Sequence, residues 1–244
     1  MNSKKNNYKK IYKHIQRLIP HDIKYALASR KRRRSPPYSM IRPGWTAFQI
    51  GCSGRLCNLG RSQAIVLSSL VGKQGHVYAF EAIPENLSAF EEYIKLHNIE
   101  NITIVPIGLW NKAGVIEFYV PQKLPNIITT GSRPKQIREN EPSRFDSTRC
   151  LPVETIDKMV DKLGIKKVHF INITTNGSEP EIIEGGLHTI IKHRPYITMP
   201  GETQQISERI TEILTDIGYE VHKNIIRLHI LGKPFKEQWA EHKY

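Results

Sequence analysis

The sequence has few cysteines and no long apolar run, and each scarcity excludes a class of protein. Its three cysteines, Cys52, Cys57 and Cys150, form no C-x-x-C pair. They provide neither a disulfide framework nor a zinc motif, and this pattern suits the reducing cytosol. No stretch approaches the ~20 apolar residues that a membrane span needs. We expect a cytoplasmic protein without a secretory signal, because the first residues contain no apolar segment of the signal-peptide kind.

Acidic residues are scarce in residues 1–34, which we call the leader. The leader holds twelve Lys or Arg and one acid, Asp22, whereas the whole chain has 36 basic and 23 acidic residues and a net charge of +13. The remaining 24 basic and 22 acidic residues therefore leave residues 35–244 at only +2. The basic character belongs to the leader, and the rest of the chain is nearly neutral.

The leader has the pattern of a basic amphipathic helix that ends at Pro20. Its apolar residues recur at helical spacing: Tyr8, Ile11, Tyr12, Ile15, Leu18 and Ile19. Such a helix either packs on the domain with its charged face in solvent, or contacts an anionic membrane surface or another polyanion. We expect a leader with a proline linker over residues 1–41 and an α/β domain over residues 42–244, with the protein cytoplasmic or peripheral at a membrane.

The stretch from Thr46 to Glu81 predicts a strand, a glycine turn, a helix and a second strand. Residues 46–50 form a short apolar run, and Gly51 and Gly54 follow as turn residues. Helical spacing continues to Gly72, and residues 76–80 are a second strand that ends at Glu81. Glycines after the first strand and an acid after the second are typical of nucleotide binding, because the acid can hydrogen-bond ribose hydroxyls.

The rest of the chain alternates in the same way. The patterns predict strands at 102–105, 115–120 (as a hairpin partner after the turn at 111–114), 168–173, 196–199, and an antiparallel pair at 221–222 and 225–231. They predict helices at 84–97, 155–163, 179–193 and 204–214. Residues 121–150 contain many prolines and little periodicity, which favours a lid or binding loop. Alternating strands and helices indicate a mostly parallel sheet with ligands at the carboxyl ends of its strands.

Three segments together resemble the FkbM-type methyltransferases, a branch of the class I S-adenosylmethionine-dependent enzymes. They are residues 43–54 with 71–81, the sequence V-E-T-I-D at 153–157, and F-I-N-I-T-T-N-G-S-E-P-E at 170–181, followed by Arg194-Pro195. The resemblance implies a Rossmann-like, mostly parallel seven-stranded sheet with helices on both faces. It also implies S-adenosylmethionine as cofactor and O-methylation of a hydroxyl on a sugar, glycan or small metabolite. The cofactor positions that it implies are Gln49, Gly51, Ser53, Gly54, Glu81, Ile107, Gly108 and Thr174.

The chain departs from this family pattern mainly by losing charge. Gln49 stands where an acid is expected at the end of the first strand. In the third segment the expected lysine, aspartate and glutamate are Asn172, Thr174 and Asn176. Pro200 stands where family members tend to have a glutamate. S-adenosylmethionine carries a net charge of +1, so the loss of carboxylates weakens its electrostatic attraction to the site.

Two acids of the pattern remain, Glu81 and Glu179. A hydroxyl acceptor benefits from a general base, which typically contributes about 10²–10⁴-fold to the rate. Glu179 is the predicted catalytic residue, although an acid at a helix start also complements the helix dipole. No metal site is predicted.

Three functions stay open at this point. The first is a working methyltransferase with a small-molecule or glycan acceptor. The second is a binding or structural module that kept the fold and lost the chemistry. The third is a methyltransferase-like domain that acts on RNA through the basic leader.

Overall fold

The computed structural model of the chain contains two sheets. It describes residues 23, 27, 29–30, 33–34, 36–52, 63–120, 133–134, 147–175, 177–200, 203–224 and 229–234. The larger sheet has seven strands: β1 (Thr46–Ile50), β2 (His76–Phe80), β3 (Ile102–Val105), β8 (Phe170–Ile173), β9 (Tyr196–Pro200), β10 (Tyr219–Asn224) and β11 (His229–Pro234). The helices are the 3-10 turn η1 (Tyr38–Met40), α3 (Gln63–Val71), α4 (Pro84–Leu96), α5 (Ile156–Lys162), α6 (Glu179–Glu184), α7 (Leu187–His193) and α8 (Gln204–Asp216).

The seven strands lie in the order β10-β11-β9-β8-β1-β2-β3. The five strands from β9 to β3 are parallel neighbours. β11 runs antiparallel to both β9 and β10. The predicted seven-stranded, mostly parallel sheet with a terminal antiparallel pair is therefore confirmed. Its parallel part places the carboxyl ends of β1, β2, β3 and β8 along one edge.

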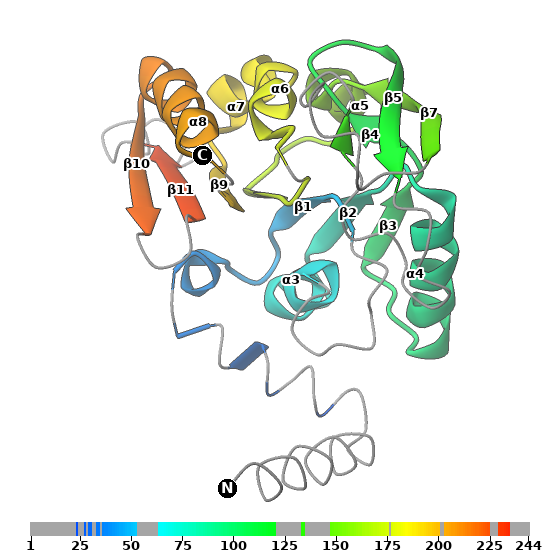
Figure 1. The fold of residues 1–244 in the computed structure, drawn as a ribbon. Helices are drawn as coiled ribbons and strands as arrows, with labels where there is room; N and C mark the ends of the chain where they lie inside the picture. Colours follow the sequence, from blue (N-terminus) through cyan, green and yellow to red (C-terminus); the bar gives the residue numbers. More distant parts are fainter. Residues whose placement is uncertain are drawn as a thin grey trace, which may run out of the picture.

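Helices cover both faces of this sheet. Figure 1 shows α3 and α4 on one face and α5, α6, α7 and α8 on the other. The alternation of β1 explains the two cores: Phe48 and Ile50 join the apolar cluster under α5–α8, and Ala47 joins the cluster under α3 and α4. Because side chains alternate along a strand, Gln49 faces α3 together with Ala47. That orientation decides which residues Gln49 can contact.

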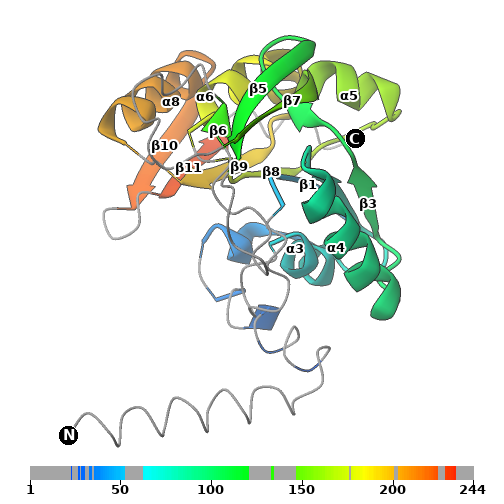
Figure 2. The same cartoon turned by 45° about the vertical axis from the view of Figure 1, so that its right-hand side comes forward.

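A second, four-stranded sheet lies beside the first, and the sequence patterns do not predict it. It contains β4 (Gly108–Leu109), β5 (Gly114–Val120), β6 (Arg133–Pro134) and β7 (Ser147–Glu154) in the order β4-β7-β5-β6. Figure 1 labels β4, β5 and β7, and Figure 2 labels β5, β6 and β7. The strand predicted at 115–120 exists, but its long partner is β7 rather than a neighbouring hairpin strand. The loop expected over 121–150 is wrong at 133–134 and 147–150, which are strands, and its role as a lid or binding loop stays a prediction. Its other residues lie outside the described part.

The single helix predicted over residues 179–193 is two helices, α6 and α7, separated at Gly185 and Gly186. Each glycine is in close contact with another element. A Cβ on Gly185 would lie 2.1 Å from the carbonyl oxygen of Trp110, and one on Gly186 would lie 2.9 Å from Ile156 Cδ1. Helical periodicity continues across this break, so the sequence pattern did not reveal it.

Most of the leader lies outside the described residues, but its end contacts the domain. Arg33 Nη2 donates to the carbonyl oxygens of Ser69 and Leu70, at 3.1 and 3.3 Å, near the end of α3. Ile41 is buried in the cluster under α3 and α4. The boundary between residues 41 and 42 stays a prediction. No helix within the described ranges is long and apolar enough to cross a membrane.

Candidate functional site

The turn after β1 brings three strand ends into contact. Gly51 has φ +78°, and a Cβ there would lie 2.4 Å from the carbonyl oxygen of Thr174. Its own N–H donates to the carbonyl oxygen of Phe80 at 2.9 Å. Only glycine combines this backbone conformation with such a close approach. The turn therefore fixes the carboxyl ends of β1, β2 and β8 at one point.

Glu81 follows β2 and is held by the turn beside it. The side chain is 8% exposed, and its two oxygens accept hydrogen bonds from the N–H groups of Cys52 (2.9 Å) and Ile83 (2.8 Å). Burial raises the pKa of this carboxyl, and hydrogen bonds from Ile83, Cys52 and the Asn86 side chain partly oppose that effect. A carboxylate offers about four lone-pair positions, and four groups of the chain donate to Glu81: the N–H groups of Cys52, Ala82 and Ile83 and the Asn86 side chain. A ligand hydroxyl that binds Glu81 would therefore share the carboxylate with these donors or displace one of them.

Neutral side chains in direct contact occupy the ends of β1 and β8. Gln49 and Asn172 are register partners in the sheet, and Asn172 Nδ2 donates to Gln49 Oε1 at 2.6 Å. Gln49 Nε2 donates to Thr174 Oγ1 at 2.9 Å, and that hydroxyl donates to the carbonyl oxygen of Gly51 at 2.9 Å. Asn172 Nδ2 also donates to Gln63 Oε1, from the first residue of α3.

We call Gln49, Gln63, Asn172 and Thr174 the neutral cluster. Three of its members stand where the family pattern has an acid, a lysine and another acid. Because Gln49 contacts both Asn172 and Thr174, the three neutral side chains satisfy one another's hydrogen bonds. Gln63 was not identified as a site residue, although a polar residue at the start of the otherwise apolar segment 63–71 is a usable signal.

Glu179 holds the loop between β8 and α6. It is 0% exposed, and its oxygens accept from the N–H groups of Thr175 (3.1 Å) and Gly177 (2.8 Å). These contacts give the carboxylate a clear role in shaping the loop. They weigh against Glu179 as a base, because proton transfer needs contact with the acceptor. Its catalytic role stays a prediction. Asn176 lies outside the described residues.

The remaining predicted cofactor residues are divided between the described and undescribed parts. Ile107 is half-buried, and its N–H donates to the carbonyl oxygen of Val105 at 2.8 Å. A Cβ on Gly108 would lie 3.4 Å from Ala82 Cβ, so this glycine lies next to the residue that follows Glu81. The structure thus brings Ile107 and Gly108 to the same edge as Gly51, Glu81 and the neutral cluster. Ser53 and Gly54 lie outside the described residues.

Thr155 and Asp157 of the V-E-T-I-D segment form hydrogen bonds at the starts of helices and do not line this edge. Thr155 Oγ1 accepts from the N–H of Lys158 and caps α5. Asp157 accepts from the N–H groups of His188 (3.2 Å) and Thr189 (2.7 Å), at the start of α7. In the described part of the chain, no group of three or more His, Cys, Asp or Glu could hold a metal ion.

Two solved structures share this arrangement of strands and helices. A methyltransferase FkbM from Methylobacillus flagellatus KT is 13% identical, with a TM-score of 0.53 over 91% of this chain. The chain spans 57% of the length of that protein. The fibrillarin of Aeropyrum pernix, solved with natively bound S-adenosyl-L-methionine, is 11% identical, with a TM-score of 0.50 over 86% of this chain and 75% of the other. The fold is that of the class I methyltransferases.

A family model identifies the chain more narrowly than its fold does. The model of the Methyltransferase FkbM domain matches residues 58–229, which is more than half of the chain. The chain therefore belongs to the FkbM methyltransferase family, and the family resemblance of its motifs is confirmed. A comparison with curated proteins gives no match.

Proposed function

We propose that this chain binds S-adenosylmethionine at the carboxyl edge of the large sheet and transfers its methyl group to a hydroxyl of a sugar, glycan or small metabolite. Family membership supports the reaction class. The observation that carries the proposal is the placement of Glu81: a buried carboxylate that follows β2 and is bonded to the turn where the ends of β1, β2 and β8 meet.

Each residue of the edge has a defined part in this proposal. The bound cofactor supplies an electrophilic methyl group for an in-line displacement, in which positioning of the two partners does most of the work. Glu81 accepts hydrogen bonds from the ribose hydroxyls. The Gly51 turn lets the backbone approach the ligand, and Ile107 and Gly108 line the adenine side. Gln49 holds the Thr174 hydroxyl just after β8, and Asn172 positions Gln49.

A second function, binding without transfer, is favoured by one observation. The neutral cluster offers no carboxylate, and Glu179 is buried with both oxygens bonded to its own loop. Among the described residues of this edge, only Glu81 and Glu179 retain the acids that the family pattern expects. A protein with this edge could hold the cofactor and lack a base for the acceptor proton.

Calorimetric titration of the full chain with S-adenosylmethionine tests binding, and Glu81→Ala tests the site. A hydrogen bond to a charged group is worth about 1.5–3 kcal/mol, so we expect this variant to bind about 10- to 100-fold more weakly. Glu92→Ala, on the exposed surface of α4, is the matched control and should bind like the unchanged chain. Absence of binding at high cofactor concentration would overturn the proposal.

A transfer assay with methyl-labelled cofactor separates the two functions. Label that moves to a sugar, glycan or metabolite hydroxyl supports the enzyme, and the Glu81→Ala variant should lose that signal. Tight cofactor binding without transfer to any member of a broad acceptor panel supports the binding function instead.

A further inference from the structure

The amino edge of the large sheet, opposite the site, is lined by cations. Four neighbouring parallel strands, β9, β8, β1 and β2, begin at this edge. The segments that lead into them are, in the same order, residues 192–195, 163–169, 41–45 and 72–75, and none of these segments contains an acid. Their cations are Arg42, Lys73, Lys166, Lys167 and Lys192, which we call the basic edge, together with Arg194. Arg194 already forms hydrogen bonds within the fold: its guanidinium donates to the carbonyl oxygens of Ile217 and Gly218.

Acids lie at the two ends of this edge rather than in its centre. Glu100 comes just before β3, and Asp216 ends α8 just before β10; β3 and β10 are the outermost strands. Asp161 lies in the last turn of α5, next to Lys162. The centre of the edge is therefore positively charged, although residues 35–244 are nearly neutral as a whole.

The pKa values of two histidines in the centre of the edge reflect this positive charge. Burial lowers the pKa of His193, and Lys167 and Lys192 lower it further. Burial also lowers the pKa of His169, with a contribution from Lys167. No carboxylate contributes to either shift. Lys167 and Lys192 are thus close enough to act on His193, and Lys167 acts on His169 as well.

The leader joins the domain at this edge. Arg33 binds the carbonyl oxygens of Ser69 and Leu70, and α3 then leads directly to Lys73. A cation at the end of a helix is favoured by the helix dipole, so this contact fixes where the leader leaves the domain. The leader that precedes this contact contains twelve Lys or Arg in its sequence.

Exposed apolar side chains lie next to basic residues in the sequence. Ile191 is 52% exposed and precedes Lys192. Ile23 and Leu27, four residues apart in the leader, are 48% and 58% exposed. Exposed Ile and Leu beside Lys and Arg fit a lipid interface, where apolar groups enter the acyl boundary and cations meet anionic headgroups. A nucleic acid would use the cations but not the aliphatic groups.

From these observations we propose that the basic edge docks this protein on an anionic membrane surface. The inference goes beyond the proposed transferase activity and does not depend on it. The cofactor site lies at the other end of the same strands, so docking leaves it open to the solvent.

The test measures binding of the full chain to two kinds of vesicle, phosphatidylcholine alone and phosphatidylcholine mixed with phosphatidylserine. We expect binding only to the anionic vesicles, with release at high salt because the attraction acts within a Debye length. The edge variant replaces three exposed lysines by glutamine: Lys73→Gln, Lys166→Gln and Lys192→Gln. A basic residue near such a surface contributes about fivefold to binding, so the triple variant should bind on the order of 100-fold more weakly.

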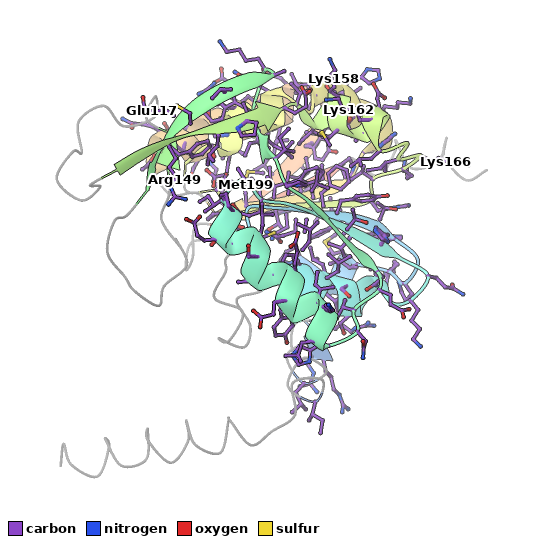
Figure 3. All side chains as sticks on the ribbon, turned by 90° about the vertical axis from the view of Figure 1, so that its right-hand side faces the viewer. Glu117, Arg149, Lys158, Lys162, Lys166 and Met199 are labelled. Carbon is purple, nitrogen blue, oxygen red and sulfur yellow. The ribbon has the colours of Figure 1, made fainter. Side chains whose placement is uncertain are left out.

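The matched control removes the same charge from the other parts of the domain. It combines Lys112→Gln, Lys158→Gln and Lys223→Gln, all exposed residues. Figure 3 shows Lys158 on α5 and Lys166 on the loop that follows this helix. We expect the control to bind within a fewfold of the unchanged chain, with circular dichroism melting showing that all proteins are folded. Equal loss in both triples, or vesicle binding indifferent to phosphatidylserine, would overturn the proposal. Binding to single-stranded RNA homopolymer without vesicle binding would overturn it as well.

Discussion

At the scale of single residues, the neutral cluster explains how the site tolerates its departures from the family pattern. A buried polar group costs free energy unless it is hydrogen-bonded. Gln49 and Asn172 are 2% and 3% exposed, and each is bonded to another member of the cluster. The cluster therefore replaces a set of compensating charges by a set of compensating amides and a hydroxyl.

A restored acid should favour the cationic cofactor over its uncharged product. Thr174→Asp adds one negative charge at the end of β8, and two unit charges at 8 Å with an effective dielectric constant of 20 interact by about 2 kcal/mol. We expect the affinity ratio of S-adenosylmethionine to S-adenosylhomocysteine to rise on the order of tenfold. Calorimetry with both ligands measures this ratio. Thr174→Asn is the uncharged control, and an equal rise in that variant would contradict the electrostatic explanation.

Glu179 gives a second prediction at this scale. Glu179→Gln keeps the size of the side chain but replaces one acceptor oxygen by a donor, which then faces a backbone N–H. An unsatisfied buried group costs about 1–3 kcal/mol, so we expect lower thermal stability and weaker cofactor binding. At saturating cofactor, kcat should fall by less than about 10-fold, because the residue positions a loop. A fall of about 10²–10⁴-fold in kcat with unchanged stability would instead identify Glu179 as the base.

At the scale of secondary structure elements, the V-E-T-I-D segment connects two helices. Asp157 lies in the first turn of α5, yet its carboxylate accepts from the N–H groups at the start of α7. Helix starts leave N–H groups without helical partners, and a side-chain acceptor there is worth about 1 kcal/mol. This segment therefore belongs to the packing of α5 against α7.

Asp157→Ala should accordingly lower the free energy of unfolding by about 1–2 kcal/mol. Denaturant unfolding measures this loss, and cofactor affinity, determined by calorimetry, should stay the same. Asp161→Ala, an exposed acid of the same helix, should change stability by less than about 0.5 kcal/mol. A drop in cofactor affinity that exceeds the loss of stability would place Asp157 in the site.

The elements differ in how far the sequence could predict them. Apolar runs identified the central strands of the large sheet, because a strand buried on both faces has to be apolar. The antiparallel pair was expected at 221–222 and 225–231, whereas its strands are Tyr219–Asn224 and His229–Pro234, because the edge strand β10 is largely polar. The same patterns placed Gly51 and Glu81 at one edge. They could not predict that β5 pairs with β7, since that pairing depends on which chain segments meet. They also missed the break at Gly185, where the cause is the close approach of Trp110, and the contact between Gln63 and Asn172.

At the scale of the whole molecule, the parallel sheet separates two sets of residues. Each parallel strand begins at the amino edge and ends at the carboxyl edge, so a cation before a strand and a site residue after it lie at opposite ends. Strand β1 gives an example. Trp45, just before β1, stacks on His169 with ring centroids 5.3 Å apart, whereas Gln49, near the other end of β1, belongs to the neutral cluster. The two edges can therefore vary independently in charge.

The amino edge also makes the stability of the fold depend on pH. His169 Nδ1 accepts from the N–H of Thr46 at 3.0 Å, and His193 Nδ1 accepts from the N–H of Val168 at 3.2 Å. Both contacts need the neutral ring, because a protonated imidazole has no acceptor nitrogen. Burial and neighbouring lysines lower both pKa values from the ordinary 6.5.

The sign of the effect follows from linkage. The unfolded chain binds protons at these histidines more readily than the folded chain, so stability is fully present above about pH 6.5 and is lost as the pH falls through the lowered folded values. Asparagine can place an acceptor oxygen near the position of Nδ1 and does not titrate. The double variant His169→Asn, His193→Asn should therefore have a flatter dependence of Tm on pH below 6.5. His188→Asn, an exposed histidine of α7, should keep the original slope, and an equal flattening there would show that the two buried histidines are not the cause.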